Sequence, residues 1–166
     1  MSKQRLALVS VLGAALVATP VLAVTVTTNL SVTANVPGGC TLSTNAVSFG
    51  DYDGTQIEVA GQLNANCTAA LDYSVELGAG TSATGSSRQM SNAGNNALKL
   101  NYDLYKDAAR SQLWGGADYT VGGASALTGQ TGTGANQVIQ IYGRLPGGQT
   151  LSAGSFADTV VVSVIY

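Results

Sequence analysis

Residues 24–36 have the sequence VTVTTNLSVTANV, in which apolar and polar positions alternate without interruption. The even-numbered positions carry valine, leucine or alanine with a single threonine, whereas the odd-numbered positions carry only threonine, serine or asparagine. Because successive side chains of a β-strand point to opposite faces, the pattern predicts a strand with one apolar and one polar face. Pro37, Gly38 and Gly39 end this strand, since proline has no N–H to donate to a ladder.

The residues before this segment have the features of a secretory signal peptide. Lys3 and Arg5 precede an apolar stretch at residues 6–17, and Ala23 ends a short Val-Leu-Ala sequence suited to cleavage. The stretch is shorter than the roughly 18 to 20 residues that a membrane span needs, so we expect residues 1–23 to be removed and the chain exported without a membrane anchor. Removing two of the seven basic residues leaves five against nine acidic ones, which disfavours nucleic acid as a partner.

Short strands separated by turn residues are predicted throughout the rest of the chain. They cover residues 40–49, 56–66, 71–77, 97–105, 136–145 and 156–166. The glycine-rich stretches 78–96 and 115–134 lack apolar periodicity and are predicted to be surface loops. Strands of this length and spacing indicate one all-β sandwich domain.

The only two cysteines, Cys40 and Cys67, both lie in the exported part of the chain. An even number of cysteines in an oxidising compartment favours a disulfide over a redox or metal site. The absence of histidine makes zinc binding still harder to support. We therefore predict a Cys40–Cys67 disulfide.

The last predicted strand, residues 156–166, is apolar on both faces towards its end, which indicates burial. We expect one edge of this strand to find no partner within the chain. Buried backbone groups left without hydrogen bonds cost of order 1 to 3 kcal/mol each, so another segment has to cover that edge.

The other groups of polar, charged and aromatic residues do not predict a catalytic or metal site. Asp51–Gly54 begins like a calcium loop but lacks the later ligands, so we predict a turn. No nucleophile has a visible base, and no catalytic residue, metal site or cofactor is predicted. Lys106, Asp107 and Arg110 are predicted to form a solvated turn. Trp114 either packs over an edge of the sandwich or lies exposed.

Several stretches taken in order resemble the spore coat U domain family, which includes the major subunits of archaic chaperone–usher pili of the Csu type. They follow the alternating N-terminal strand and are CTAALDYSVELGAG from Cys67, NYDLYKDAARSQLWGG at 101–116, IYGRLPGGQ at 141–149 and AGSFADTVVVSVIY at 153–166. The resemblance implies an incomplete immunoglobulin-like sandwich that lacks its last strand. A hydrophobic acceptor groove would then run beside the C-terminal strand.

The resemblance also implies how the groove is filled. A periplasmic chaperone occupies it first, and at the outer-membrane usher the N-terminal strand of the next subunit replaces the chaperone. The donor strand would be residues 24–36 and the pilin domain residues 37–166. The side chains expected to enter the groove are Val26, Thr28, Leu30, Val32 and Ala34. The residues expected to line it or to meet the chaperone are Phe156, Val160, Val162, Val164 and Tyr166.

The function that follows is a structural, non-enzymatic subunit of an extracellular pilus used in attachment and biofilm formation, with identical or related subunits as partners. The alternative is a self-contained secreted or coat protein whose N-terminal strand pairs within its own chain. Such a protein would bind a partner through its loops.

Overall fold

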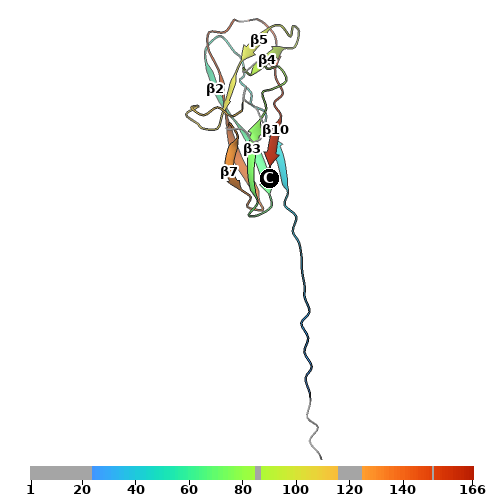
Figure 1. Ribbon diagram of the computed structural model, residues 1–166. Coiled ribbons are helices and arrows are strands. Elements are labelled where there is room, and N and C mark those ends of the chain that lie inside the picture. The colour runs from blue at the N-terminus through green and yellow to red at the C-terminus, as the bar shows by residue number, and fades with distance from the viewer. Residues whose placement is uncertain (1–23, 85–86, 116–124, 151) are drawn as a thin grey trace, which may run out of the picture. The chain divides into compact units, whose positions relative to one another are not determined.

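The computed structural model describes residues 24–84, 87–115, 125–150 and 152–166 (Figure 1). The predicted signal peptide, residues 1–23, lies outside them. The chain divides into two compact units, of which the first ends at Asn35 and the second begins at Val36. Residues 24–35 belong to no strand, and their apolar side chains are exposed, with Val26 at 90% and Leu30 at 87% of full exposure. Within the described residues, no helix has the length and hydropathy of a membrane span.

The described part of the second unit is built from β-strands, all paired antiparallel. The strands are β1 (Cys40–Thr44), β2 (Ile57–Cys67), β3 (Asp72–Leu77), β4 (Gln89–Asn92), β5 (Lys99–Asn101), β6 (Asp103–Tyr105), β7 (Leu127–Thr131), β8 (Asn136–Leu145), β9 (Phe156–Ala157) and β10 (Val162–Ile165). They form sheets in the orders β1-β2-β8-β6, β10-β3-β7 and β5-β4-β9. The predicted all-β class is confirmed.

The core lies where the apolar faces of these sheets meet. Along β2, Leu63 and Ala65 are fully buried and alternate with the exposed side chains of Gln62 and Asn66, as the period of a strand requires. Trp114 is also fully buried, and its indole N–H donates to the carbonyl oxygen of Val75 at 3.1 Å. Of the two positions open to Trp114, the structure therefore shows the packed one.

The predicted disulfide is present between Cys40 and Cys67. These residues are also the terminal pair of the β1–β2 ladder. The bond therefore fixes the beginning of β1 to the end of β2.

Both stretches predicted to be surface loops contain strands, so that prediction was wrong. Residues 78–96 include β4, which pairs with β5 and β9, and residues 115–134 include β7, which pairs with β3. These strands have the sequences QMSN and LTGQT. β4 pairs with the nearby β5 and the distant β9, and β7 pairs with the distant β3, so the hydrogen-bonded ladders hold both strands in place without a strongly apolar face.

Arg110 also departs from the predicted solvated turn. Its side chain is only 13% exposed and forms an ion pair with Glu58 at 3.0 Å. Its guanidinium donates to the carbonyl oxygens of Val59 and Gly143 at 3.2 Å each, and it lies 5.8 Å from the centre of the Tyr142 ring. Arg110 therefore joins β2 and β8 across the outer face of their sheet.

Candidate functional site

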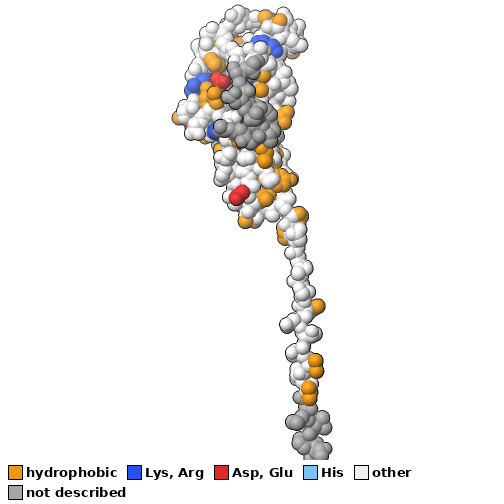
Figure 2. Space-filling view, viewed as in Figure 1, with side chains coloured by type: hydrophobic (Ala, Val, Ile, Leu, Met, Phe, Trp, Pro, Cys, Tyr) orange, Lys and Arg blue, Asp and Glu red, His pale blue; other side chains and the backbone are white. Residues whose placement is uncertain are grey.

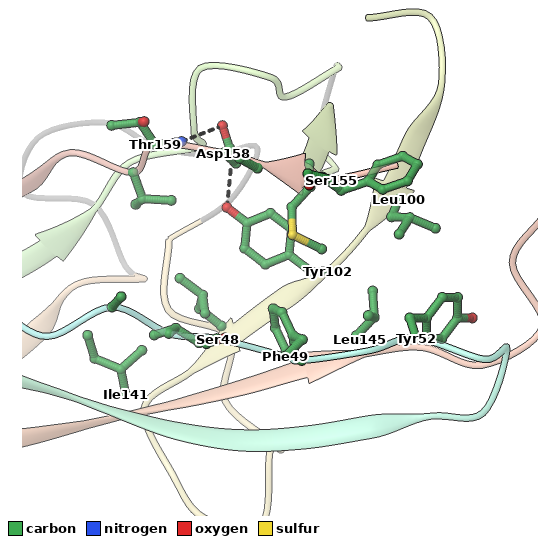
Figure 3. Close-up of a pocket in the computed structure, with 18 of the residues that line it drawn as sticks. Ser48, Phe49, Tyr52, Leu100, Tyr102, Ile141, Leu145, Ser155, Asp158 and Thr159 are labelled. Carbon is green, nitrogen blue, oxygen red and sulfur yellow. Dashed lines mark hydrogen bonds between the residues drawn. The ribbon is translucent and has the colours of Figure 1, made fainter. Parts of the chain in front are cut away.

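A groove of about 1000 Å³ lies between two stretches of chain that are far apart in the sequence (Figure 3). One wall consists of residues 44–52, which continue from β1. The other wall comes from residues 152–162, which include β9 and lead into β10. In Figure 3, Phe49 stands on the first wall and Asp158 on the second, with Tyr102 between them.

The first wall loses its backbone partner where the groove begins. The N–H of Asn45 donates to the carbonyl oxygen of Gln62 at 3.0 Å, which continues the β1–β2 ladder by one residue. Beyond it, no backbone–backbone hydrogen bond joins residues 46–52 to any other described residue. This stretch therefore presents a free backbone edge.

Within the part of the chain that the structure describes, backbone hydrogen bonds reach the second wall from one side only. The carbonyl oxygen of Val161 accepts from Gly78 N–H at 2.8 Å, and that of Thr159 accepts from Thr81 N–H at 3.0 Å. β10 then pairs with β3 and lies at the edge of its sheet. Because alternate residues of a strand direct their backbone groups to opposite edges, those of Val160 and Val162 face away from β3. The second wall thus presents a free edge as well.

The floor of the groove is apolar. Aliphatic and thioether side chains from all three sheets reach it: Leu77, Met90, Leu100, Leu104, Ile141 and Leu145. The Phe49 ring packs against the Tyr102 ring, with 6.1 Å between centroids and planes tilted by 59°. Such a surface favours contact with apolar side chains over water.

The first wall is held by side chains that pack against two glycines of the sheet beneath it. A Cβ at Gly61 would lie 2.6 Å from Val47 Cγ2, and one at Gly143 would lie 3.1 Å from Phe49 Cζ. The absence of a side chain at these positions lets Val47 and Phe49 reach the backbone of β2 and β8. Packing therefore replaces the missing ladder along this wall.

Asp158 holds the second wall through four hydrogen bonds. Its carboxylate accepts from the Tyr102 hydroxyl at 2.7 Å, the Thr159 N–H at 2.8 Å, the Ser82 N–H at 2.9 Å and the Thr81 hydroxyl at 3.0 Å. Burial alone would raise the pKa of Asp158, but these hydrogen bonds outweigh it and lower that pKa. Burial, together with the bond to Asp158, raises the pKa of the Tyr102 hydroxyl.

The predicted acceptor residues lie in two places. Phe156, Val160 and Val162 line the groove, whereas Val164 packs against the core without lining it. Tyr166 is 62% exposed and lies beside a separate shallow depression near Tyr73. The predicted strand 156–166 is in fact divided into β9 and β10, which belong to different sheets.

The first wall and the floor were not identified from the sequence. The one available signal was the apolar alternation of Val47 and Phe49 within the strand predicted at 40–49. That alternation could not indicate that the strand pairing ends at Thr44. Among the described residues, no three His, Cys, Asp or Glu side chains are grouped so that they could hold a metal ion.

Comparison with known proteins places these features in context. The family described as Spore Coat Protein U domain matches residues 26–163. Protein U of Myxococcus xanthus is 34% identical over 173 aligned positions, covering 93% of each chain.

A similar fold occurs in a solved structure, the CsuC–CsuE chaperone–tip adhesion subunit pre-assembly complex from archaic chaperone–usher Csu pili of Acinetobacter baumannii. The TM-score is 0.60 at 22% identity, over 79% of this chain. This chain spans 40% of the length of the chain it matches there. At this identity the likeness concerns the fold.

Proposed function

Because this chain belongs to the spore coat protein U domain family, we propose that it is a structural, non-enzymatic subunit of a pilus assembled by the chaperone–usher pathway. In this proposal, residues 24–36 of one copy form a donor strand that fills the groove of the next copy. Repetition of the joint builds a fibre on the cell surface. The fibre serves in attachment and biofilm formation.

The observation that carries the proposal is the match between the groove and the donor strand. The groove has two free backbone edges above an apolar floor, which is the environment of a missing strand. The wall at residues 44–52 and the donor face from Val26 to Ala34 are each nine residues long. The donor segment is uncharged, and its apolar side chains are exposed (Figure 2).

Insertion of such a strand would satisfy both partners. The inserted backbone would donate and accept hydrogen bonds along both walls, as in other cases of strand addition to a sheet edge. Each Val or Leu buried on the floor would contribute roughly 1.5 to 3 kcal/mol. Because donor and groove are different surfaces of the same molecule, the contact is head-to-tail and need not close into a ring.

Before assembly the groove also needs a cover. We infer that a periplasmic chaperone supplies it, and that an outer-membrane usher exchanges the chaperone for the donor strand. The fold likeness to a chain of a chaperone–subunit pre-assembly complex supports the chaperone as a partner. The predicted signal peptide would bring the chain to the compartment in which the chaperone acts.

Deletion of residues 24–36 tests the proposal. The truncated chain is expected to fold when a chaperone or a synthetic peptide of sequence VTVTTNLSVTANV fills its groove, but to form no fibres visible by electron microscopy. The same peptide with its central residue, Leu30, exchanged for aspartate is the matched control and is expected not to stabilise the chain.

The opposite result would support a self-contained secreted or coat protein. In that case the full-length chain would be a stable monomer without fibres, and residues 24–36 would be protected from protease. Truncation would then unfold it, and added chaperone would make no difference.

A further inference from the structure

The linker between the alternating segment and β1, Pro37–Gly39, is held by contacts with residues that follow β2. Thr68 N–H donates to the carbonyl oxygen of Gly39 at 2.9 Å, one step beyond the Cys40–Cys67 pair and in the same register. The ladder would normally be completed by a bond from Gly39 N–H to the carbonyl of Thr68. That carbonyl instead accepts from Leu71 N–H at 3.2 Å, where the chain turns after β2.

The hydroxyl of Thr68 takes the place of its carbonyl. Gly39 N–H donates to Thr68 Oγ1 at 3.1 Å, so the pairing continues although β2 has ended. The hydroxyl proton in turn has two acceptors within reach, the carbonyl oxygens of Gly39 at 3.3 Å and Pro37 at 3.5 Å. One side chain therefore contacts both ends of the linker.

Leu71 constrains the middle of the linker. A Cβ at Gly38 would lie 3.1 Å from Leu71 Cδ1, so the leucine side chain lies directly against the backbone of this residue. Pro37 adds a fixed φ near −65°. Each linker residue is thus restricted by a contact or by its own ring.

The proposed function creates a competition, because residues 24–36 could enter either the groove of another copy or the groove of their own chain. A three-residue connection is one of the common lengths for a β-hairpin. Residues 24–36 could therefore fold back alongside residues 40–52 and occupy the groove of their own chain. Such a reversal has to occur at Pro37–Gly39, and it requires Gly39 to leave the ladder.

We propose that Thr68 is a positioning residue that clamps the linker to the end of the β1–β2 ladder and so directs the donor strand to a second copy of the chain. The inference rests on the proposed function. It assigns to Thr68, which is outside both the groove and the donor strand, the choice between self-insertion and polymerisation.

The direct test is amide hydrogen exchange of the full exported chain. Gly39 N–H is expected to be protected in the wild type, and Thr68→Val, which keeps the shape but removes the hydroxyl, is expected to speed its exchange about fivefold, the factor given by the net contribution of one hydrogen bond. The amides within β2 should be unaffected. Exchange of wild-type Gly39 at the rate of an unstructured peptide would overturn the proposal, whether or not the variant folds.

The functional test is the ratio of monomer to polymer after assembly, measured by size-exclusion chromatography. Thr68→Val is expected to raise this ratio about fivefold, with residues 24–36 of the monomer protected from protease by self-insertion. Thr68→Ser, which retains a hydroxyl, should behave as the wild type. Thr41→Val makes the same change on β1 at a hydroxyl not bonded to the linker, and it should have no effect.

The two proposals fail in different ways. An unchanged monomer-to-polymer ratio in Thr68→Val, with normal wild-type fibres, would refute the clamp and leave the pilus function standing. Absence of polymer from the wild type would refute the pilus function, while the exchange of Gly39 would still report on the clamp.

Discussion

β2 and β8 pair over ten consecutive residues, Ile57–Asn66 with Asn136–Leu145, whereas the two walls of the groove share no hydrogen bond within the described residues. Both regions have apolar side chains directed at the same core. They differ in what satisfies the backbone. Each of β2 and β8 has a neighbour on both sides in its own sheet, but each groove wall has a free edge.

The difference separates two requirements that a sandwich usually meets together. Burial of apolar side chains is largely achieved by this chain alone, as the fully buried Leu63, Val75 and Trp114 show. The chain does not complete the backbone ladder at the groove by itself, and each backbone group buried without a partner costs about 1 to 3 kcal/mol. The chain can thus be well packed on one side and still depend on another strand on the other.

The largest effect is expected where the missing strand would enter. Leu30→Asp would place a charge on the apolar floor, which is costly without a partner, so fibre growth should stop. Capture by a chaperone should persist, because the variant's own groove is unchanged. Ser31→Asp, on the polar face of the same strand, is the control and should still polymerise. Normal fibres from Leu30→Asp, seen by electron microscopy, would show that the assigned face is wrong.

The next effect concerns the disulfide, which lies outside the groove. Replacing both Cys40 and Cys67 by alanine opens a loop with a sequence separation of 27 residues, and we expect a loss of about 3 to 4 kcal/mol in the free energy of unfolding. Urea denaturation of the full chain would measure it. A reductant should lower the stability of the wild type and leave the double variant unchanged. Two reactive thiols in the native wild type would contradict the disulfide.

The fully paired part of the fold, around β2 and β8, is the part that could be predicted best from the sequence. The strand predicted at residues 136–145 is β8 with the same bounds, because its apolar alternation is long and regular. β4 and β7 were missed because neither has such a face. The half-buried position of Arg110 could not be predicted from the sequence, since its partners Glu58 and Gly143 lie more than thirty residues away.

The groove and its two walls were predicted only in part. The apolar C-terminal sequence predicted a strand with an unpaired edge, and β10 does lie at the edge of its sheet. The predicted burial was wrong, because Val162–Ile165 are only half-buried and Val161 and Tyr166 are exposed. Val164 and Tyr166 were predicted to line the groove but do not form part of its second wall, because the chain crosses from one sheet to another near Asp158. The opposite wall depends on Gly61 and Gly143, whose role is visible only once distant strands are side by side.

Gly61→Ala probes how that opposite wall is held. The added methyl would meet Val47 Cγ2 at 2.6 Å, and overpacking of this kind typically costs about 1 to 3 kcal/mol. The wall should shift, so that both the free energy of unfolding and the affinity for a donor peptide should fall. Adding Val47→Ala removes the clash, so the double variant should recover part of both. Strictly additive losses in this double-mutant cycle would mean that Val47 does not rest on Gly61.

The smallest effect is expected at Asp158 on the other wall. Its pKa is lower in the folded chain than the ordinary value of 3.8, so the ionised form favours folding. This contribution is complete above pH 3.8 and is lost as the pH falls through the lower pKa of the folded state. Asp158→Asn should therefore lower the urea midpoint at pH 6, and the difference from the wild type should shrink between pH 4 and pH 2. A difference that stays constant over that interval would show that the contribution of Asp158 to stability does not depend on the charge of its carboxylate.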